Sequence, residues 1–324
     1  MKAIVYERYG GPEVLELREV DKPAVADDCV LVRVRAASVN PVDWHMMTGT
    51  PYIVRLMVGL RRPRETRIGG DFAGTVESVG EDVTQLRPGD DVFGIRTGAF
   101  AEYVCVREAV APMPGNLTFE QAGTMGVAAI TALQGLRDHG RLEAGQKVLI
   151  NGASGGVGTF AVQVAKAMGA QVTGVCSTAN VELVRSLGAD DVLDYTQEDF
   201  TRSGERYDLM LDVAGNRPWR ECRRVLKKHA TYVSVGAPKK KRGLVGPARR
   251  LLTTRLRGIR ASQNLVVFIA KPNRDDLLAL RELVEAGKVT PVIDRSYGLA
   301  ETPDAVAYLG GWHARGKVVI TVSS

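Results

Sequence analysis

Residues 147–178 read KVLINGASGGVGTFAVQVAKAMGAQVTGVCST, in the order of a strand, a glycine-rich turn, a helix and a second strand. The first strand, at 147–151, is a short apolar run of the kind that is buried on both faces of a parallel sheet. Phe160, Val164 and Met168 follow with helical spacing, and Gly169 is suited to end that helix. This stretch therefore predicts the βαβ unit of a doubly wound α/β fold.

The turn at 152–158 is typical of a dinucleotide-binding site. Small residues let backbone N–H groups approach a pyrophosphate, and the dipole of the following helix favours its negative charge. The strict G-x-G-x-x-G spacing lacks its first glycine, because that position is Ala153. The surrounding strands and helix still favour nucleotide binding over a merely tight turn. We expect the cofactor to contact Ser154, Gly155, Gly156 and Val157.

The residues after the second strand indicate which dinucleotide is preferred. Sites for NAD usually place an Asp or Glu about 20 residues after the loop, where it holds the ribose 2′-hydroxyl. Here residues 176–180 read CSTAN and offer no carboxylate that would repel a 2′-phosphate. Polar groups such as Ser177 can surround that phosphate, and Arg185 is the nearest downstream cation. The sequence thus favours NADPH.

Three segments follow one another along the chain. Residues 1–121 look all-β, because short β-rich runs alternate with glycine and proline turns. From 122 to 270 strand and helix patterns alternate, which is the signature of a parallel sheet. In 271–324 a helix is expected at 274–286, after which the chain returns to short elements. With 324 residues the chain is long enough for two domains, each with its own core.

No run approaches the roughly 18 apolar residues of a membrane span, and the first residues lack a signal-peptide pattern. We therefore expect a cytoplasmic protein.

Six ordered motifs along nearly the whole chain carry a family resemblance. They are AASVNPVD at 36–43, GDFAG at 70–74, RPGDDV at 87–92, the turn at 151–158, LGAD at 187–190 and GKVVI at 316–320. Together they resemble the medium-chain dehydrogenase/reductase superfamily, specifically its zinc-free quinone oxidoreductase branch and the reticulon-interacting-protein-like subgroup. The resemblance implies a GroES-like catalytic β-domain formed by 1–121 and 271–324, with an NADPH-binding Rossmann domain at 122–270 inserted into it.

The same resemblance bears on metal binding. In the zinc alcohol dehydrogenases of the superfamily, the first cysteine ligand would fall at Asn40 and a histidine–glutamate pair at Asp71 and Phe72. None of these residues is the Cys or His that a catalytic zinc typically requires. The four histidines of the chain are scattered without ligand spacing. We predict an enzyme that works without a metal.

Without a Lewis acid, hydride addition to a quinone or an α,β-unsaturated carbonyl is easier than reduction of a simple ketone, because the developing charge spreads to a distant oxygen. We place Asn40 and Tyr52 at the nicotinamide end as catalytic candidates. The amide of Asn40 can donate to a developing enolate oxygen or fix the ribose; the alternative is a turn residue before Pro41. Tyr52 donates a hydrogen bond or a proton, or only packs over the site.

Further cofactor contacts are expected where successive strands end, at the carboxyl edge of the sheet. By the resemblance, Thr131 matches a position near the carboxamide and Tyr195 one beside the 2′-phosphate. The remaining expected contacts, whose alternative is an ordinary strand-end turn, are Val213, Ala214, Gly215, Val235, Gly236 and Ala237.

The leading hypothesis is an NADPH-dependent, zinc-independent oxidoreductase that transfers hydride to a quinone or an α,β-unsaturated carbonyl. An enoyl-thioester reductase is the alternative within the enzyme class. A nucleotide-binding protein with little turnover, which senses redox state or binds a partner, is the alternative outside it. We expect a small-molecule substrate and either a monomer or a homodimer.

Residues 239–260 carry nine Lys or Arg and no acidic residue, whereas the rest of the chain has 34 basic and 37 acidic residues. Leucines and an isoleucine interleave with the arginines as in an amphipathic helix. We hypothesise that this segment borders the substrate entrance and attracts either the anionic lipid of a membrane or an acidic substrate; a lid and a solvated face are the alternatives. Nucleic acid is not expected, because no recognition motif accompanies the charge. A second basic cluster follows Tyr52 and comprises Arg55, Arg61, Arg62, Arg64 and Arg67.

Overall fold

A computed structural model describes residues 1–235 and 262–322 of the chain. The chain divides into two compact units. The first unit comprises Met1–Ile130, Lys271–Ala286 and Pro291–Ser324, and the second comprises Thr131–Ala270 and Gly287–Thr290. The boundaries expected from the sequence were 121 and 270, with 287–290 placed in the catalytic domain.

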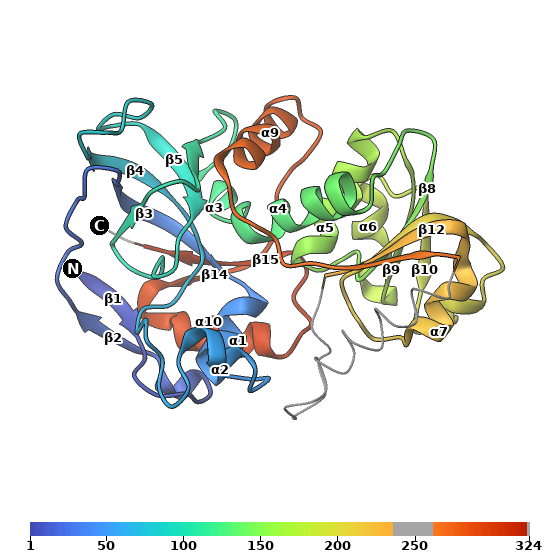
Figure 1. Ribbon diagram of the computed structural model, residues 1–324, viewed down its shortest axis with the longest axis horizontal. Helices are drawn as coiled ribbons and strands as arrows, with labels where there is room; N and C mark the ends of the chain where they lie inside the picture. Colours follow the sequence, from blue (N-terminus) through green and yellow to red (C-terminus); the bar gives the residue numbers. More distant parts are fainter. Residues whose placement is uncertain (236–261, 323–324) are drawn as a thin grey trace. The chain divides into compact units, whose positions relative to one another are not determined.

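The second unit contains one sheet of six parallel strands, in the order β10-β9-β8-β11-β12-β13 (Figure 1). They are β8 (Lys147–Asn151), β9 (Gln171–Cys176), β10 (Asp191–Asp194), β11 (Tyr207–Asp212), β12 (Leu226–Ser234) and β13 (Asn264–Val267). Counted from β8, this is the 3-2-1-4-5-6 order of doubly wound dinucleotide-binding sheets. The predicted Rossmann-type sheet is confirmed. Ligands of such sheets bind beyond the carboxyl ends of the strands where the order reverses, here between β8 and β11.

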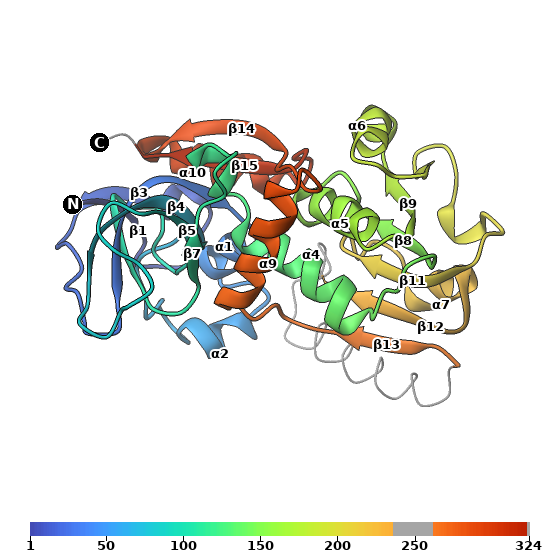
Figure 2. The same ribbon diagram turned by 90° about the horizontal axis from the view of Figure 1, so that it is seen from above.

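Helix α5 (Gly156–Ala167) buries Phe160 and Val164 and packs against β8 and β9, beside which it lies in Figure 2. Helix α6 (Val181–Ser186) packs against β9 and β10. The short α7 (Trp219–Cys222) precedes β12, and α4 (Gly126–Gln134) leads into the unit from the first one. These helices follow the strand–helix alternation that the sequence predicts.

The first unit is built on a seven-stranded sheet in the order β14-β15-β3-β4-β5-β7, with β6 also paired to β3. Its strands are β3 (Val30–Val39), β4 (Asp71–Val79), β5 (Asp91–Ile95), β6 (Tyr103–Val106), β7 (Val110–Pro112), β14 (Ile293–Gly298) and β15 (Lys317–Thr321). A separate hairpin-like pair joins β1 (Lys2–Val5) to β2 (Glu16–Glu19). Figure 1 shows that β1 and β15, from opposite ends of the chain, belong to this unit. Its core includes the buried side chains of Val32, Phe72, Phe100 and Ile320.

The expectation that residues 1–121 are all-β is wrong. Residues 1–121 contain α1 (Pro41–Thr48), α2 (Val54–Val58) and most of α3 (Phe119–Ala122). The rest of the first unit adds α10 (Thr302–Gly310) and α9 (Arg274–Glu285), which confirms the helix expected at 274–286. The start of α1 has a sequence signal, because Pro41 occupies the first turn and the carboxylate of Asp43 accepts the backbone N–H of Asn40 at 2.7 Å. Helices this short show no apolar periodicity, so a pattern search overlooks them.

None of the helices within the described residues is both long and apolar enough to cross a membrane. The basic segment 239–260 and the expected cofactor residues Gly236 and Ala237 lie outside the described residues.

Candidate functional site

The glycine-rich turn of the second unit is shaped by close backbone packing. Gly152 has a φ of 92°, a left-handed conformation that favours glycine. A Cβ on Gly158 would lie 2.1 Å from the carbonyl oxygen of Gly152, so this position of α5 must also be glycine. A Cβ on Gly155 would meet nothing closer than 3.6 Å. The helix therefore packs tightly against residues 152–153 of the turn at Gly158, whereas the turn stays open at Gly155, where the helix begins.

The open side is the start of α5, whose first N–H groups have no partner within the helix. Ser154, Gly155, Gly156 and Val157 all belong to this turn or to the first turn of the helix. The N–H of Gly155 donates to the carbonyl oxygen of Gly152 at 3.2 Å, and the N–H groups of the first turn of α5 lie at the positive end of the helix dipole, which suits a pyrophosphate.

Ser154 and Ser177 come together through Asn180. The amide nitrogen of Asn180 donates to the hydroxyl oxygens of both serines at 3.2 Å. Its other polar atom, Oδ1, is buried and accepts no hydrogen bond from the described part of the chain. A buried acceptor without a partner is costly unless a ligand or water satisfies it. A ribose hydroxyl beside this cluster would do so, and the arrangement fits the adenosine end of a dinucleotide.

Ser177 and Tyr195 are neighbours across two strands, because the residues before them, Cys176 and Asp194, pair in the sheet. The backbone N–H of Tyr195 donates to the carbonyl oxygen of Cys176 at 3.0 Å, and Tyr195 is 44 % exposed. Sequence reasoning missed Asp194 here. Its carboxylate accepts hydrogen bonds from the side chain of Thr178 and from the backbone of Thr196, and these bonds hold its pKa below the ordinary value. A negative charge therefore lies close to the expected 2′-phosphate position.

Asp212, at the end of β11, connects three strand ends at the reversal of the sheet order, and sequence reasoning missed it too. Its Oδ1 accepts hydrogen bonds from the amide of Asn151 at 2.8 Å and from the backbone N–H of Gly215 at 2.9 Å. The hydroxyl of Tyr232 on β12 donates to Oδ2. Asp212 is fully buried, so these donors compensate a charge that would otherwise be costly. The position at a strand end was the available signal.

Asp212 also positions the expected cofactor residues around it. The N–H groups of Val213 and Ala214 donate to the carbonyl oxygen of Asn151 at 3.0 and 3.1 Å, and that of Val235 donates to the carbonyl oxygen of Asp212 at 3.0 Å. Residues 213–215 and 235 therefore gather at one edge of the sheet, as predicted.

Two further residues expected to contact the cofactor are Thr131, which is buried, and Arg185, which is paired with a carboxylate. Thr131 is the first residue of the second unit and is 6 % exposed. Arg185 is paired with Glu182 at 2.8 Å on an exposed face of α6, so part of its charge is already compensated.

In the first unit, three neighbouring strands bring Asn40, Asp71 and Lys317 together. Ser38 pairs with Asp71 across β3 and β4, while Val39 pairs with Val318 across β3 and β15. Asn40, Asp71 and Lys317 are 1 %, 0 % and 3 % exposed. The ammonium group of Lys317 lies 2.5 Å from Oδ1 of Asn40 and 3.2 Å from Oδ2 of Asp71. Sequence reasoning missed Lys317, which is 246 residues from Asp71.

The side-chain amide of Asn40 is held at both ends. Its Oδ1 accepts from Lys317, and its nitrogen donates to the carbonyl oxygen of Ser38 at 3.2 Å and to Asp71 at 2.9 Å. Both amide hydrogens thus have acceptors within the protein. Donation to a substrate oxygen would require one of these bonds to be exchanged, and the longer bond to Ser38 is the weaker one.

Asp43 is a second buried carboxyl beside Asn40, and it is 2 % exposed. Burial raises its pKa from an ordinary 3.8 to about 7, and the nearby Asp71 adds to the rise. The hydrogen bond from the backbone of Asn40 and the charge of Lys317 act in the opposite direction. The cluster therefore contains a group that titrates near neutral pH.

Tyr52 does not share this buried environment. It precedes α2, is 46 % exposed, and its ring lies 4.9 Å from the guanidinium carbon of Arg55. This packing is compatible with both roles considered for Tyr52, as a donor to the substrate and as a residue that only packs over the site.

The residues at the expected zinc positions do not fit a catalytic zinc. Oδ1 of Asp71 accepts the backbone N–H of Val127 at 2.6 Å, and Oδ2 accepts from Ser38, Asn40 and Lys317. Phe72 points into the core and is fully buried. Within the described residues no group of three or more His, Cys, Asp and Glu side chains could hold a metal ion. A fully engaged carboxylate and an amide beside an ammonium group are a poor ligand set for a cation.

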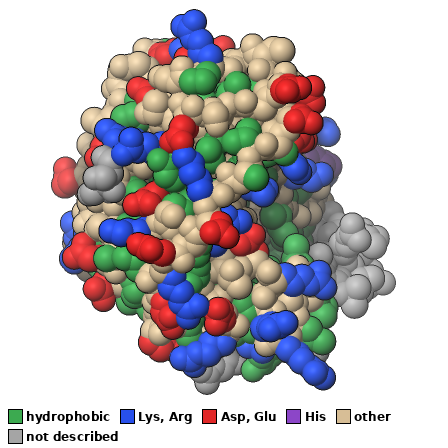
Figure 3. All heavy atoms as spheres, turned by 90° about the vertical axis from the view of Figure 1, so that its left-hand side faces the viewer, with side chains coloured by type: hydrophobic (Ala, Val, Ile, Leu, Met, Phe, Trp, Pro, Cys, Tyr) green, Lys and Arg blue, Asp and Glu red, His purple; other side chains and the backbone are tan. Residues whose placement is uncertain are grey.

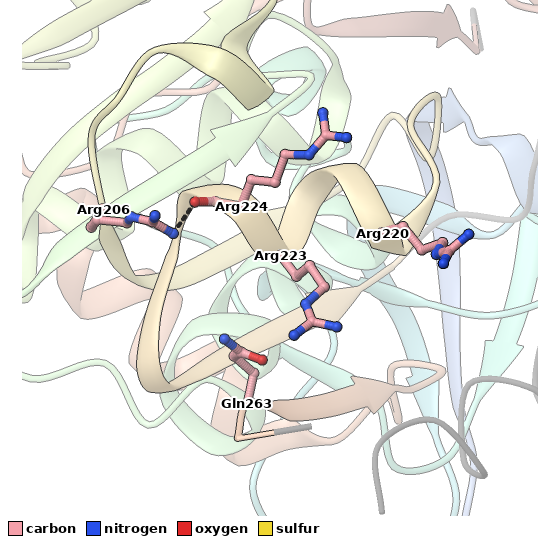
Figure 4. A pocket seen from close by; sticks show the side chains of 5 residues that line it. All are labelled: Arg206, Arg220, Arg223, Arg224 and Gln263. Atoms are coloured by element: carbon pink, nitrogen blue, oxygen red, sulfur yellow. Dashed lines mark hydrogen bonds between the residues drawn. The ribbon is translucent and has the colours of Figure 1, made fainter. Parts of the chain in front are cut away.

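A separate pocket of the second unit, of about 480 Å³, is lined by arginines (Figure 4). The arginine before β11 donates to the backbone of the α7–β12 connection, as the dashed line shows. The lining residues precede β11, β12 and β13, at the edge of the sheet opposite to the strand ends described above. They are Arg206, Arg220, Arg223, Arg224 and Gln263. This pocket is therefore not the expected cofactor site.

The two units, with a GroES-like sheet in one and a dinucleotide-binding sheet in the other, define a class of NAD(P)H-dependent oxidoreductases. Family models support each half: residues 26–115 match an alcohol dehydrogenase GroES-like domain, and residues 187–320 match a zinc-binding dehydrogenase domain. The chain belongs to the medium-chain dehydrogenase/reductase superfamily, among its quinone oxidoreductase-like and RTN4IP1-like members.

Three relatives illustrate this membership. The chain is 37 % identical to the NAD(P)H oxidoreductase RTN4IP1, mitochondrial, of Homo sapiens, over 99 % of this chain and 89 % of that protein. It is 34 % identical to the NADPH-dependent alkenal/one oxidoreductase, chloroplastic, of Arabidopsis thaliana, over 99 % and 79 %. The solved quinone oxidoreductase of Coxiella burnetii superposes with a TM-score of 0.87 at 29 % identity, over 100 % and 99 % of the two chains. The family resemblance, the fold class and the assignment as an oxidoreductase are confirmed.

Proposed function

We propose that the protein uses NADPH to reduce a quinone or an α,β-unsaturated carbonyl compound and does so without zinc. The observation that carries the proposal is that one unit has a dinucleotide-binding sheet edge, while the other has a buried polar cluster of Asn40, Asp71 and Lys317 that is a poor ligand set for zinc. The relatives support the substrate class, since their names describe NAD(P)H, quinone and alkenal/one oxidoreductases.

The cofactor, when bound, supplies the hydride. In our proposal, the start of α5 holds the pyrophosphate, and Ser177 with Tyr195 holds the 2′-phosphate. Residues 213–215 and 235, with Thr131, contact the nicotinamide half; Gly236 and Ala237, which were also expected to contact the cofactor, lie outside the described residues. Arg185 is already paired with Glu182, so in our proposal it attracts the 2′-phosphate by its charge and forms no hydrogen bond with it.

Asn40 and Tyr52 are the proposed catalytic residues of the first unit. Lys317 and Asp71 fix the amide of Asn40 in one orientation, so its contact with the ribose or the substrate oxygen would be preorganised. Tyr52 is exposed enough to reach a ligand or to cover one. Without a Lewis acid, this site suits acceptors that delocalise the developing charge themselves.

The deciding experiment follows NADPH consumption by the purified protein with a panel of quinones and enones. We expect turnover with several members of the panel and none with simple saturated ketones. A protein that binds NADPH but consumes none with any acceptor would instead be a redox-sensing or partner-binding protein. Selective turnover of long acyl thioesters would favour the enoyl-thioester reductase.

We further propose a cytoplasmic location for the protein. The related proteins of human and Arabidopsis are named mitochondrial and chloroplastic, so localisation of a tagged protein in its own cells is the test.

A further inference from the structure

The segment around α2 presents large apolar side chains to solvent. Leu56 is 68 % exposed, Met57 is 74 % exposed and Leu60 is 66 % exposed, and Ile53 is 40 % exposed at the start of the helix. Ile53, Leu56 and Met57 have the spacing of neighbours on one side of a helical turn. Several large apolar side chains gathered on the surface usually mark an interaction site.

The segment is anchored so that these side chains stay outside. Nε of Arg55 donates to the carbonyl oxygen of Gly49 at 3.1 Å, and its guanidinium carbon lies 4.4 Å from the ring centre of Tyr9. The hydroxyl of Tyr9 in turn donates to the carbonyl oxygen of Gly59. Here the charged residue faces the protein while leucine and methionine face outwards, which is the reverse of an ordinary surface helix.

Positive charge adjoins the apolar side chains. Residues 52–64 contain no Asp or Glu, and Arg61, Arg62 and Arg64 are exposed. The acidic residue that follows, Glu65, is paired with Arg67 at 3.1 Å. In Figure 1, α2 lies at the lower edge of the first unit, and Figure 3 shows Lys and Arg side chains beside hydrophobic ones along the lower edge.

We propose that residues 53–64, the α2 patch, dock the protein on the surface of an anionic lipid bilayer. The apolar side chains of Leu56, Met57 and Leu60 enter the boundary between headgroups and acyl chains, and the three arginines contact the lipid phosphates. Outward apolar side chains bordered by arginines, without acidic residues, match the chemistry of such a surface. This proposal concerns a surface of the first unit alone and does not depend on the proposed substrate.

The test is co-sedimentation of the full chain with vesicles of phosphatidylcholine alone or mixed with phosphatidylserine, at low and at physiological salt. Two variants address the two components of the patch. The charge variant carries Arg61→Gln, Arg62→Gln and Arg64→Gln, and the apolar variant carries Leu56→Gln, Met57→Gln and Leu60→Gln. All six positions are exposed, so both variants should keep the wild-type thermal unfolding curve.

We expect the wild-type protein to bind the anionic vesicles, and to bind less as salt shortens the screening length from about 30 Å to about 8 Å. The charge variant should bind on the order of 100-fold more weakly at low salt, since each arginine lost weakens binding several-fold. The apolar variant should bind at least about tenfold more weakly.

A matched control separates the α2 patch from general basicity. Arg220→Gln, Arg223→Gln and Arg224→Gln remove three exposed arginines from the other unit, and this variant should bind like the wild type. The proposal would be overturned if the wild-type protein did not bind anionic vesicles. It would also be overturned if the control variant lost as much binding as the charge variant. An apolar variant that binds vesicles normally but changes the oligomeric state would assign the patch to a second copy of the chain instead.

Discussion

Asp71 uses both carboxylate oxygens to connect distant parts of the first unit. It receives the hydroxyl of Ser38, the amide of Asn40 and the ammonium of Lys317, and it caps α4 through the N–H of Val127. Removing either member of a buried ion pair leaves an uncompensated charge, which is strongly destabilising. The orientation of Asn40 therefore depends partly on Asp71 and Lys317, which lie far from it in the sequence.

Asp43 should make the stability of the protein depend on pH. The pKa of Asp43 in the folded protein is about 7, above the ordinary value of 3.8. The contribution of Asp43 to the free energy of unfolding is therefore complete below about pH 4, and it is lost as the pH rises to 7, because the unfolded chain gives up this proton first. At about 1.4 kcal/mol for each tenfold change in proton affinity, the loss amounts to roughly 4 kcal/mol. Asp43→Asn cannot ionise, and its carbonyl can still accept the N–H of Asn40.

Denaturant unfolding of both proteins at a series of pH values measures this effect. We expect the difference in unfolding free energy between variant and wild type to shift in favour of the variant as the pH rises from 4 to 7. Parallel curves would show that Asp43 ionises normally in the folded protein.

Ser177 should govern the choice between NADPH and NADH. In Ser177→Asp a carboxylate replaces a hydroxyl beside the expected 2′-phosphate, so NADPH should bind at least about tenfold more weakly. NADH, which lacks that phosphate, should be little affected. Asp194→Asn is the counterpart, because it removes a negative charge from the same strand ends and should raise the preference for NADPH. Titrations of both cofactors against the three proteins give these ratios; unchanged ratios would place the phosphate elsewhere.

In the connection from β8 to α5, one glycine is closely packed against the backbone and another has free space beside it. The closely packed one is Gly158, whose neighbour is the carbonyl oxygen of Gly152, and the one with free space is Gly155. Two substitutions of the same size can therefore separate folding from ligand binding.

Gly158→Ala should destabilise the protein by about 1–3 kcal/mol, because its Cβ would need the space of a backbone oxygen. Gly155→Ala has room and an extended backbone with φ of −85°, so its unfolding free energy should stay within about 0.5 kcal/mol of the wild type. Its methyl group faces the expected pyrophosphate, and NADPH binding should weaken about tenfold. Thermal unfolding and cofactor titration test the pair. Normal NADPH binding by Gly155→Ala would argue against this turn as the phosphate site.

Whether the whole protein contains zinc can be measured directly. The family model that matches residues 187–320 is named for zinc binding, whereas the positions expected for zinc ligands hold an amide at Asn40, a fully bonded carboxylate at Asp71 and a buried phenyl ring at Phe72. We expect elemental analysis to find no stoichiometric zinc in the purified protein, and chelators to leave its activity unchanged. One tightly bound zinc per chain, with activity lost on its removal, would contradict this expectation.

Local patterns in the sequence predicted the second unit well. The strand, turn and helix at 147–178 each depend on residues a few positions apart, and parallel strands place their carboxyl ends at one edge whatever their exact bounds. For that reason cofactor contacts at 154–157, 177 and 213–215 could be expected there, whereas Tyr195 was expected from the family resemblance; these contacts remain proposals. In the first unit the helix at 274–286 was predicted, whereas the short α1 was missed, because its start signal at Asn40 and Asp43 is not periodic.

The sequence by itself determined the class of fold and of cofactor, because those follow from local periodicity and from the small residues of one turn. Tertiary structure alone decided that Lys317 meets Asp71 and Asn40, that Asp212 joins three strand ends, and that Leu56 and Met57 face solvent. Which strands become neighbours depends on pairing between segments far apart in the chain, and no local pattern encodes that pairing.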